Sequence, residues 1–558
     1  MFRESTRNVQ LDIFGEPSLS MCKRATKLYT DPKAWQNRFY ELVTSQVDET
    51  IFKPLFKDVN NGAPTCSIRA IVGMMVYKAG CGCSDRELEE KSDFDMLLRR
   101  ALGLFNLNAS APSIDSYYKF RSRLVEYKIL HGEDLFAKCF SKLTGLQAAK
   151  FNISGKSVRM DSKLIGSNIA WYSRYQLIHT TFCKEVRQML GYMSDKLRKQ
   201  AEELLEENAK NVVYTSDQSA IQSKLDYIGH VIYAIITELN ICSGLLYRVF
   251  TEQYDIVADK DDEGNDTGST HVAPKDKRSI SADSLQNPND PDAAYRQKGE
   301  QRVKGYSANL TETTDEEGKP SLVVDAQVKP ATAADNAYVQ DALKHAEEVT
   351  GNAARTLYSD GAYNSESNRD YATANGIDLV LTGVQGKPSR FELEMEDDTL
   401  TVTDKKTGEV LPAERRGDKW RIRVTGEHVS YRYFTEEYLK RVTERKRLQE
   451  IPQETRNKRN NVEATIFQYC FHTRNNKTRY RGLEKHRMHT YARCMWMNLV
   501  RLVIFQNTLN QRSFFALKSL LWADIERFCR IIGFKTQDEG NFIGFRLSLL
   551  KRMAVAYA

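Results

Sequence analysis

The chain has 558 residues and a net charge of +7, with 41% hydrophobic and 28% charged residues. This length and composition predict a globular protein of two to four domains with a large core. The sequence has no apolar run of about 18 residues and no apolar segment near its start, which excludes a predicted membrane span or secretion signal and favours a cytoplasmic protein.

Residues 1–150 show apolar side chains at helical spacing and predict a helical domain. Ser84 with Glu87 forms the pattern of a capping box, which predicts a helix beginning just after Ser84. Ser113 or Asp115 is expected to cap a second helix. Short helices joined by turns resemble helical DNA-binding modules, although helical domains of other functions share this pattern.

A strand is predicted in the stretch KSVRMDSKLIG, because Val158 and Met160 are typical of strands. Asp161 lies at its centre. A carboxylate in a buried strand is costly unless it is paired or bound to a cation, so Asp161 is a candidate functional residue. The weaker alternative is a turn or cap residue.

The region from Ser167 to Phe250 is expected to be helical. The next segment, from Asp255 to Glu300, contains eleven acidic residues and many Gly, Asn, Ser and Pro residues. This composition predicts a mobile loop, most simply a linker.

Alternating strands and helices follow this acidic segment. Residues 301–313 and 321–330 predict two strands, and the next helix is expected to end at Gly351. A third strand then ends at Asp360, before another helix and a strand at 378–381. This order indicates an α/β core with some parallel pairing, in which ligand sites lie beyond the carboxyl ends of strands. Taken alone, Asp360-Gly361 is better explained as an ordinary turn.

Residues 391–424 alternate with a period of two and predict a small β insertion. The chain then becomes basic, with thirteen Lys or Arg and five Asp or Glu between Arg441 and Arg487, which points to a polyanion such as nucleic acid or to a solvated helix face. Glu463 lies on a predicted helix in this region, one turn after Arg459. Further helices are expected near residues 490–509 and 519–534.

Asp161, Asp360 and Glu463 together form a coherent nuclease-type set. Carboxylate oxygens suit Mg²⁺ or Mn²⁺. Two such ions about 3.5–4 Å apart activate an attacking hydroxyl and stabilise a leaving oxygen in phosphoryl transfer. Spacing along the chain does not show that the three carboxylates meet.

In their order along the chain, these segments resemble the DDE transposases of bacterial insertion sequences. The resemblance is carried by APSIDSYYKFRSRL with its Phe120-Arg121 pair, VRMDSKLIGSNIAW, KGYSANL, YSDGAYNSE, RNNVEATIFQ, RYRGLEKHRMH and ARCMWMNLVRL. It implies an α/β, ribonuclease H-like mixed sheet with an N-terminal helical domain. The implied parts are a helical DNA-binding or dimerisation domain (1–150), a catalytic domain (151–490) with a helical and acidic-loop insertion (about 180–298) and a β insertion (about 388–433), and a helical C-terminal segment (491–558).

The resemblance also implies roles for individual residues. Asp161, Asp360 and Glu463 are the expected catalytic residues and ligands of two Mg²⁺ or Mn²⁺ ions. Related enzymes often carry Tyr at the place of Arg456 and Lys at the place of Cys470, so other basic residues are expected to take over these DNA contacts. The expected DNA-binding residues are Arg459, Arg456, Lys458, Lys477, Arg479, Arg481, Tyr363 and Arg121.

The implied activity is metal-dependent cleavage at transposon ends followed by attack of the freed 3′-hydroxyl on target DNA. The implied partners are double-stranded DNA, as transposon ends and target, and a second copy of the chain, at least when DNA is bound. The implied location is the bacterial cytoplasm, at the nucleoid. Two alternatives stay open: a catalytically inactive or domesticated DNA-binding protein, and a host nuclease of the same fold.

Overall fold

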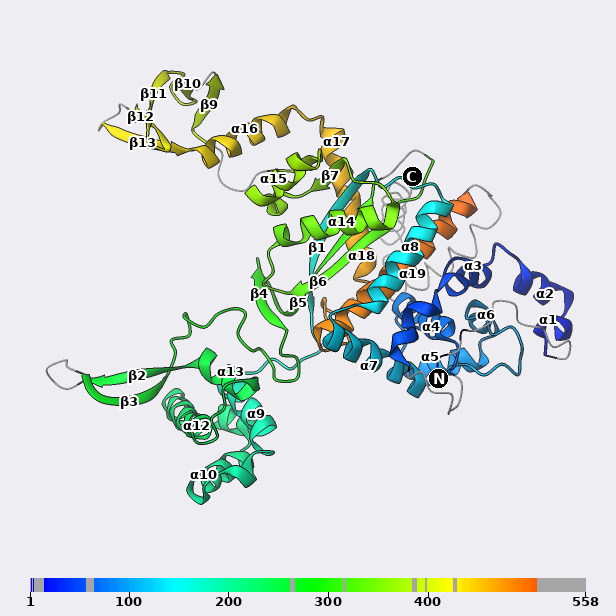
Figure 1. The fold of residues 1–558 in the computed structure, drawn as a ribbon, viewed down its shortest axis with the longest axis horizontal. Helices are drawn as coiled ribbons and strands as arrows, with labels where there is room; N and C mark the ends of the chain where they lie inside the picture. Colours follow the sequence, from blue (N-terminus) through cyan, green and yellow to red (C-terminus); the bar gives the residue numbers. More distant parts are fainter. Residues whose placement is uncertain are drawn as a thin grey trace, which may run out of the picture.

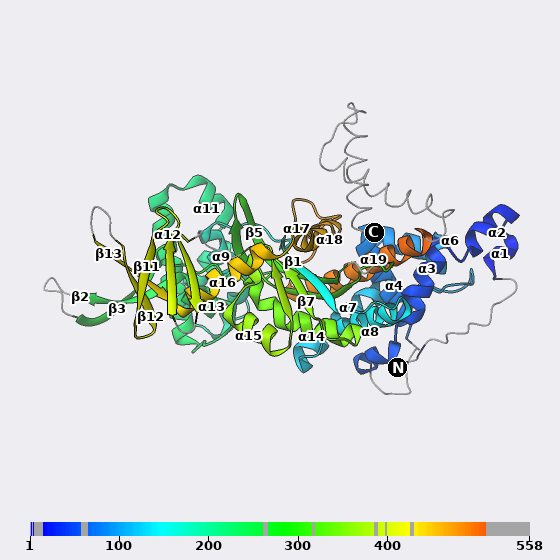
Figure 2. The same ribbon diagram turned by 90° about the horizontal axis from the view of Figure 1, so that it is seen from above.

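The computed structural model describes residues 2, 4, 15–56, 65–260, 266–314, 318–383, 389–396, 399–424 and 429–508. A central sheet lies between a helical N-terminal region and two lobes that project away from it (Figures 1 and 2). One lobe is the β9–β13 sheet, and the other contains α9–α13 with the β2–β3 hairpin (Figure 1).

The N-terminal region is helical, as predicted. The predicted capping box is present at the start of α5, where the Ser84 hydroxyl accepts a hydrogen bond from the Glu87 amide and the Glu87 carboxylate accepts one from the Ser84 amide. Ser113 caps α7. Its helices are α1 (Pro17–Ser20), α2 (Lys23–Thr30), α3 (Trp35–Leu42), α4 (Ile68–Cys81), α5 (Asp85–Phe94), α6 (Met96–Ala101), α7 (Ile114–His131) and α8 (Leu135–Lys150), with 3-10 turns η1 (Thr44–Gln46) and η2 (Glu49–Leu55).

The central sheet is mixed, and its strand order is β4-β5-β1-β7-β8, with β6 also paired to β5. Strands β1, β7 and β8 are parallel, whereas β4, β5 and β6 pair antiparallel. The parallel pairing predicted from the alternation of strands and helices is confirmed. The strands are β1 (Ser157–Gly166), β4 (Ala294–Lys298), β5 (Gln301–Thr313), β6 (Val323–Pro330), β7 (Thr356–Ser359) and β8 (Asp378–Leu381).

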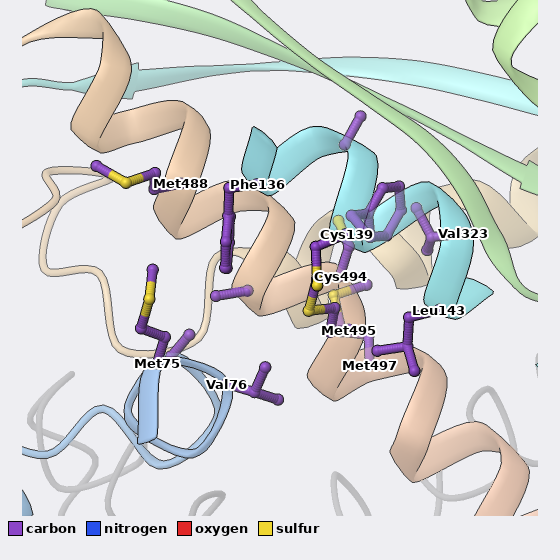
Figure 3. Packing of buried hydrophobic residues seen from close by; sticks show 14 of the residues in the cluster. Met75, Val76, Phe136, Cys139, Leu143, Val323, Met488, Cys494, Met495 and Met497 are labelled. Carbon is purple, nitrogen blue, oxygen red and sulfur yellow. The ribbon is translucent and has the colours of Figure 1, made fainter. Parts of the chain in front are cut away.

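Helices cover this sheet and join it to the N-terminal region. Helix α19 packs against α4, α8 and β6. Figure 3 shows the resulting contact, where Met75 of α4, Phe136 of α8 and Met495 of α19 lie in one buried cluster. A single continuous core therefore holds the N-terminal helices and the sheet together. The other helices of this part are η4 (Asp335–Tyr338), α14 (Val339–Thr350), η5 (Gly361–Tyr363), α15 (Glu366–Ala374), α17 (Gln453–Asn457), η6 (Lys458–Asn460), α18 (Asn461–Tyr469) and α19 (Leu483–Thr508).

The helical lobe has a hydrophobic core of its own. The acidic segment after it is more ordered than expected. Strands β2 (Tyr254–Lys260) and β3 (Asp266–Pro274) pair as a hairpin, and β4 joins the edge of the central sheet, so the prediction of a loop is wrong for these strands. The helices are α9 (Arg174–Val186), η3 (Leu190–Tyr192), α10 (Asp195–Glu206), α11 (Ala209–Thr215), α12 (Gln218–Glu238) and α13 (Gly244–Gln253).

Buried contacts explain the order of this segment. Asp290 is fully buried, and its carboxylate accepts hydrogen bonds from Ser167 and Tyr306. Composition alone does not reveal such contacts, because they join residues far apart in the chain.

The period-two segment forms a five-stranded antiparallel sheet in the order β13-β12-β11-β10-β9. Its buried face packs with Leu439 of α16 (Glu436–Glu450), which leads back to the central sheet. The strands are β9 (Phe391–Glu396), β10 (Thr399–Asp404), β11 (Val410–Arg416), β12 (Lys419–Val424) and β13 (Ser430–Thr435).

The helix expected near residues 490–509 is the C-terminal part of α19. The helix expected at 519–534 lies outside the described residues. Within the described part of the chain, no helix is long and apolar enough to cross a membrane.

Candidate active site

Asp161 and Asp360 lie side by side because of the register between two parallel strands. The pairing of β1 with β7 sets Arg159 opposite Tyr358. Asp161 comes two residues after Arg159, and Asp360 comes two residues after Tyr358, so the same register sets the two acids opposite each other. Asp360 comes directly after β7 and caps η5, where its Oδ1 accepts a hydrogen bond from the Ala362 amide at 2.7 Å. The carboxylate therefore stands at the carboxyl end of the strand, where ligands bind in α/β sheets.

The Asp161 carboxylate is largely buried, with 17% of its side chain exposed. Burial raises its pKa, the Arg459 guanidinium opposes this rise, and the nearby charge of Asp360 adds to it. A neighbouring negative charge disfavours ionisation of a carboxyl group, so this contribution to the pKa of Asp161 indicates that the Asp360 carboxylate lies near it. A cation bound between Asp161 and Asp360 would reduce this repulsion, as expected for a carboxylate in a buried strand.

Arg459 joins Asp161 to the third acid. Its guanidinium lies 3.2 Å from Oδ2 of Asp161 and 3.7 Å from Oε1 of Glu463. Glu463 is on the first turn of α18, and 65% of its side chain is exposed. This helix has an apolar stripe, because Val462, Ile466 and Tyr469 are buried. Packing of α18 on β1 thus brings Glu463 to the same face as Asp161.

The donor set suits a divalent cation, since all three acids offer hard oxygen ligands. The Nε atom of Arg459 is buried without a hydrogen-bond partner, so this guanidinium is held at the site by charge more than by a complete set of hydrogen bonds. Among the described residues, no group of three or more His, Cys, Asp or Glu side chains is close enough to hold a metal ion. Arg459 lies between the two flanking acids, and Glu463 points to solvent.

A buried ionic network fixes α18 beside β1. Glu312 of β5 is fully buried and accepts hydrogen bonds from Arg159 at 2.5 Å, Arg501 at 2.7 Å and the Thr465 hydroxyl at 2.6 Å. Burial would raise the pKa of Glu312, but Arg159 and Arg501 outweigh it and hold this pKa below its usual value. The sequence analysis missed this network. The available signal was Glu312 itself, because it is the single charged residue in the second half of the predicted strand 301–313.

The opposite face of β1 has its own polar contacts. Ser162 donates to Asp335 at 2.7 Å, and the Tyr363 hydroxyl donates to Asn309 at 2.7 Å. Tyr363 is only 2% exposed. Tyr363 packs in the core near Asp360 and does not reach the surface. The structure therefore fits a packing role for Tyr363, and the expected DNA contact is wrong for this conformation.

A pocket of about 690 Å³ opens beside Glu463. Its lining includes Lys163, Phe467, Cys470 and Arg474. Lys163 lies two residues after Asp161 on β1, so its side chain is on the same face. Cys470 stands where related enzymes often have Lys, and here Lys163 brings an amine to the same pocket from the facing strand. The sequence analysis did not single out Lys163.

The expected DNA-binding residues form two groups. Lys458 and Arg456 immediately precede the site on η6 and α17, with the Lys458 amine 5.9 Å from the centre of the Tyr358 ring. The second group lines a different cavity, to which the N-terminal helices also contribute. Its members are Arg121 of α7, Arg479 and Arg481. Lys477 lies beside the end of β1, where it pairs with Gly166, and its amine donates to the Ile169 carbonyl at 2.9 Å.

The mixed sheet, with two carboxylates side by side and a third on a helix packed against β1, defines an α/β domain of the ribonuclease H-like class. Residues 29–123 match a family described as "Transposase domain (DUF772)", and residues 420–503 match one described as "Transposase DDE domain". Searches of curated proteins and of solved structures found no match. The two family matches support a DDE transposase of the insertion-sequence type, as the sequence motifs predicted.

Proposed function

We propose that this transposase binds the DNA ends of its element, cleaves them and joins the freed 3′-hydroxyl to target DNA, with Asp161, Asp360 and Glu463 as its catalytic residues. The observation that carries the proposal is the matching register of Asp161 and Asp360 on parallel strands. Glu463 joins them through Arg459 and the packing of α18 on β1.

The three acids reach the proposed reaction centre from two different elements, the central sheet and helix α18. Asp161 and Asp360 present oxygens from the sheet, and Glu463 presents its oxygens from the solvent side of α18. Bound Mg²⁺ or Mn²⁺ supplies charge neutralisation and activation of the attacking hydroxyl. Lys163 and Arg459 bind non-bridging phosphate oxygens on either side of Glu463, because both cations lie on this face. Arg456 and Lys458 extend the phosphate contacts along the same edge.

The proposed partner is duplex DNA, both as the element's ends and as the target. Joining two ends requires that two active sites act together, so we propose a homodimer on DNA, at the bacterial nucleoid. We propose that the parts predicted from sequence, the N-terminal region 1–150 and the C-terminal segment 491–558, contribute to this assembly.

Two alternatives make different predictions. An inactive or domesticated DNA-binding protein binds the DNA ends but does not cleave them with any divalent metal ion. A host nuclease of the same fold cuts DNA but yields no joined products. Inverted repeats flanking the gene favour the transposase over both.

The test is cleavage of duplexes that carry the flanking gene ends, with Mg²⁺ or Mn²⁺. Wild-type protein is expected to nick at the ends, and Asp360→Asn to lose this activity at least a hundredfold while binding DNA as before. The matched control is Asp370→Asn, an exposed acid on α15, which is expected to cleave normally. Equal cleavage by wild type and Asp360→Asn would remove Asp360 from the site, and binding without cleavage by wild type would favour the inactive protein.

A further inference from the structure

Strand β4 joins the inserted segment to the central sheet. It follows the helical lobe and the β2–β3 hairpin in the chain, and it pairs antiparallel with β5 at the edge of the sheet (Figure 1). Lys298 lies opposite Gln301 at the end of this pairing, and Gly299 adopts a left-handed conformation, with φ of 60°, in the tight turn between them. The insertion therefore contributes a strand to the same sheet that holds Asp161.

A buried acid fixes the start of β4. Asp290 precedes this strand, and its carboxylate accepts hydrogen bonds from the hydroxyl groups of Ser167 and Tyr306. Ser167 follows β1, and Tyr306 is part of β5. All three side chains are buried. The position of β4 relative to β1 is therefore set by contacts in the core.

Arg296 anchors the middle of β4 beside β1. Its guanidinium donates to two backbone carbonyls that follow β6, at 3.2 and 2.9 Å, and lies 3.9 Å from one carboxylate oxygen of Asp335. The other oxygen of Asp335 accepts a hydrogen bond from the Ser162 hydroxyl at 2.7 Å. Ser162 directly follows Asp161 on β1. A chain of contacts therefore leads from β4 to the residue next to Asp161.

Lys298 lies two residues beyond Arg296, so the two side chains leave β4 on the same face. Burial raises the pKa of Asp161, and the charge of Lys298 is among those that lower it, as the charge of Arg459 does. A cation has this effect on a carboxyl group when it lies nearby. Lys298 is exposed and makes no ion pair within the described part of the chain, although Glu300 is close to it in sequence.

Lys298 and Lys163 flank Asp161 from the two faces of the sheet. Ser162 and Lys163 are neighbours on β1, so their side chains point to opposite faces. The contacts of Arg296 lead to the face of Ser162, whereas Lys163 lines the pocket beside Glu463. A DNA strand carries phosphate charges on both sides of any phosphate that reacts, so one cation on each face suits such a strand.

We propose that Lys298 is a positioning residue that contacts a phosphate next to the one that reacts, on the side of Asp161 away from Lys163. This inference rests on the proposed function, because it takes DNA as the substrate. It assigns the insertion a part in the active site, since its last strand carries the contact and Arg296 holds that strand in place. An ammonium group binds phosphate as a point charge, so this contact places the strand without reading its bases.

The test combines Lys298→Gln with DNA from which single phosphate charges are removed. End duplexes carry one neutral methylphosphonate at each position flanking the cleavage site in turn, and binding is measured in EDTA by fluorescence anisotropy. At one of these positions the methylphosphonate is expected to weaken wild-type binding roughly eightfold at 0.1 M salt, because one phosphate contact contributes about 0.9 to the slope of log affinity against log salt. Lys298→Gln is expected to bind that duplex and the unmodified duplex equally well.

Arg302→Gln is the matched control. Arg302 is an exposed cation of the same hairpin, and it lies opposite Gln297, so its side chain leaves the other face of the hairpin. Arg302→Gln is expected to keep the eightfold effect of the methylphosphonate. Lys298→Arg retains the charge and is expected to keep this effect as well, which a role of Lys298 in folding alone does not predict.

The inference is overturned when each methylphosphonate weakens Lys298→Gln as much as it weakens the wild type, because Lys298 then contacts none of these phosphates. Loss of the effect in Arg302→Gln as well would also overturn it, since the hairpin would then act through its net charge. Cleavage of the ends by the wild-type protein would leave the proposed function standing in both cases. Failure of the wild-type protein to bind or cleave the ends would instead remove the proposed function, and the inference with it.

Discussion

The guanidinium of Arg459 lies 3.2 Å from the carboxylate of Asp161. Glu463 lies on the other side of Arg459, at 3.7 Å. A side-chain cation therefore stands between two acids that a divalent ion would share in the proposed reaction. Arg459 neutralises part of their charge in the free protein and, in the proposed reaction, would compete with the metal for the same oxygens.

Replacing Arg459 by Gln is expected to tighten Mn²⁺ binding in the absence of DNA. The loss of one positive charge beside Asp161 and Glu463 makes the site more negative, by an amount worth about 1 kcal/mol, or roughly fivefold in affinity. Isothermal titration with Mn²⁺ measures this change. Arg456→Gln is the control, because Arg456 makes no ion pair with these acids. Unchanged or weaker Mn²⁺ binding by Arg459→Gln would show that Arg459 does not compete for the site.

Replacing Lys163 by Ala is expected to weaken DNA binding and cleavage. The amine of Lys163 reaches the pocket beside Glu463, so its loss removes one phosphate contact and lowers the salt slope of binding by about 0.9. The decisive measurement adds Cys470→Lys, which returns an amine from the other wall of the same pocket. Lys163→Ala/Cys470→Lys is expected to recover the slope, whereas Lys163→Ala/Cys470→Met is not. If neither double variant differs from Lys163→Ala, the two positions do not serve the same phosphate.

Replacing Glu312 by Gln is expected to destabilise the domain that contains the central sheet by about 3–5 kcal/mol. The change leaves the buried guanidinium groups of Arg159 and Arg501 without their shared carboxylate. Urea unfolding followed by circular dichroism measures the loss. Glu414→Gln, at an exposed ion pair with Arg421, is the matched control and is expected to stay within about 0.5 kcal/mol of wild type. A loss of the same small size at Glu312 would mean that the two arginines find other partners.

The same network predicts a dependence of stability on acid. The pKa of Glu312 is lowered in the folded protein relative to the unfolded chain, so its ionised form favours folding. This contribution is complete above the unfolded pKa of about 4.3 and is lost as pH falls through the folded pKa. The difference in unfolding free energy between wild type and Glu312→Gln is therefore expected to be constant from pH 5 upward and to shrink below about pH 4. A difference that stays constant down to pH 3 would contradict this account.

Local patterns were enough to predict several elements. Residues 301–313 form β5 with the predicted bounds, and Gly351 ends α14 in a left-handed conformation, because both depend on neighbours in the chain. The pairing of Asp161 with Asp360 required the strand register, which follows from parallel packing and is not visible in spacing. The Glu312 network and the contacts of Asp290 join segments far apart in sequence, so composition alone did not show that these two acids are buried.

Replacing Gly80 by Ala is expected to destabilise the contact between the N-terminal helices and α19. Gly80 lies inside α4, where helix propensity alone predicts that Ala stabilises by about 1 kcal/mol. A methyl group at this position would overlap the indole ring of Trp496, which is part of α19, and such overpacking costs about 1–3 kcal/mol. We therefore expect a lower thermal midpoint for Gly80→Ala and no loss for Gly191→Ala, where the added methyl meets open space. The Gly80 carbonyl also accepts hydrogen bonds from His472 at 2.8 Å and Arg493 at 2.9 Å, so movement of α4 disturbs the loop between α18 and α19. A higher midpoint for Gly80→Ala would show that Trp496 moves aside and that helix propensity decides the outcome.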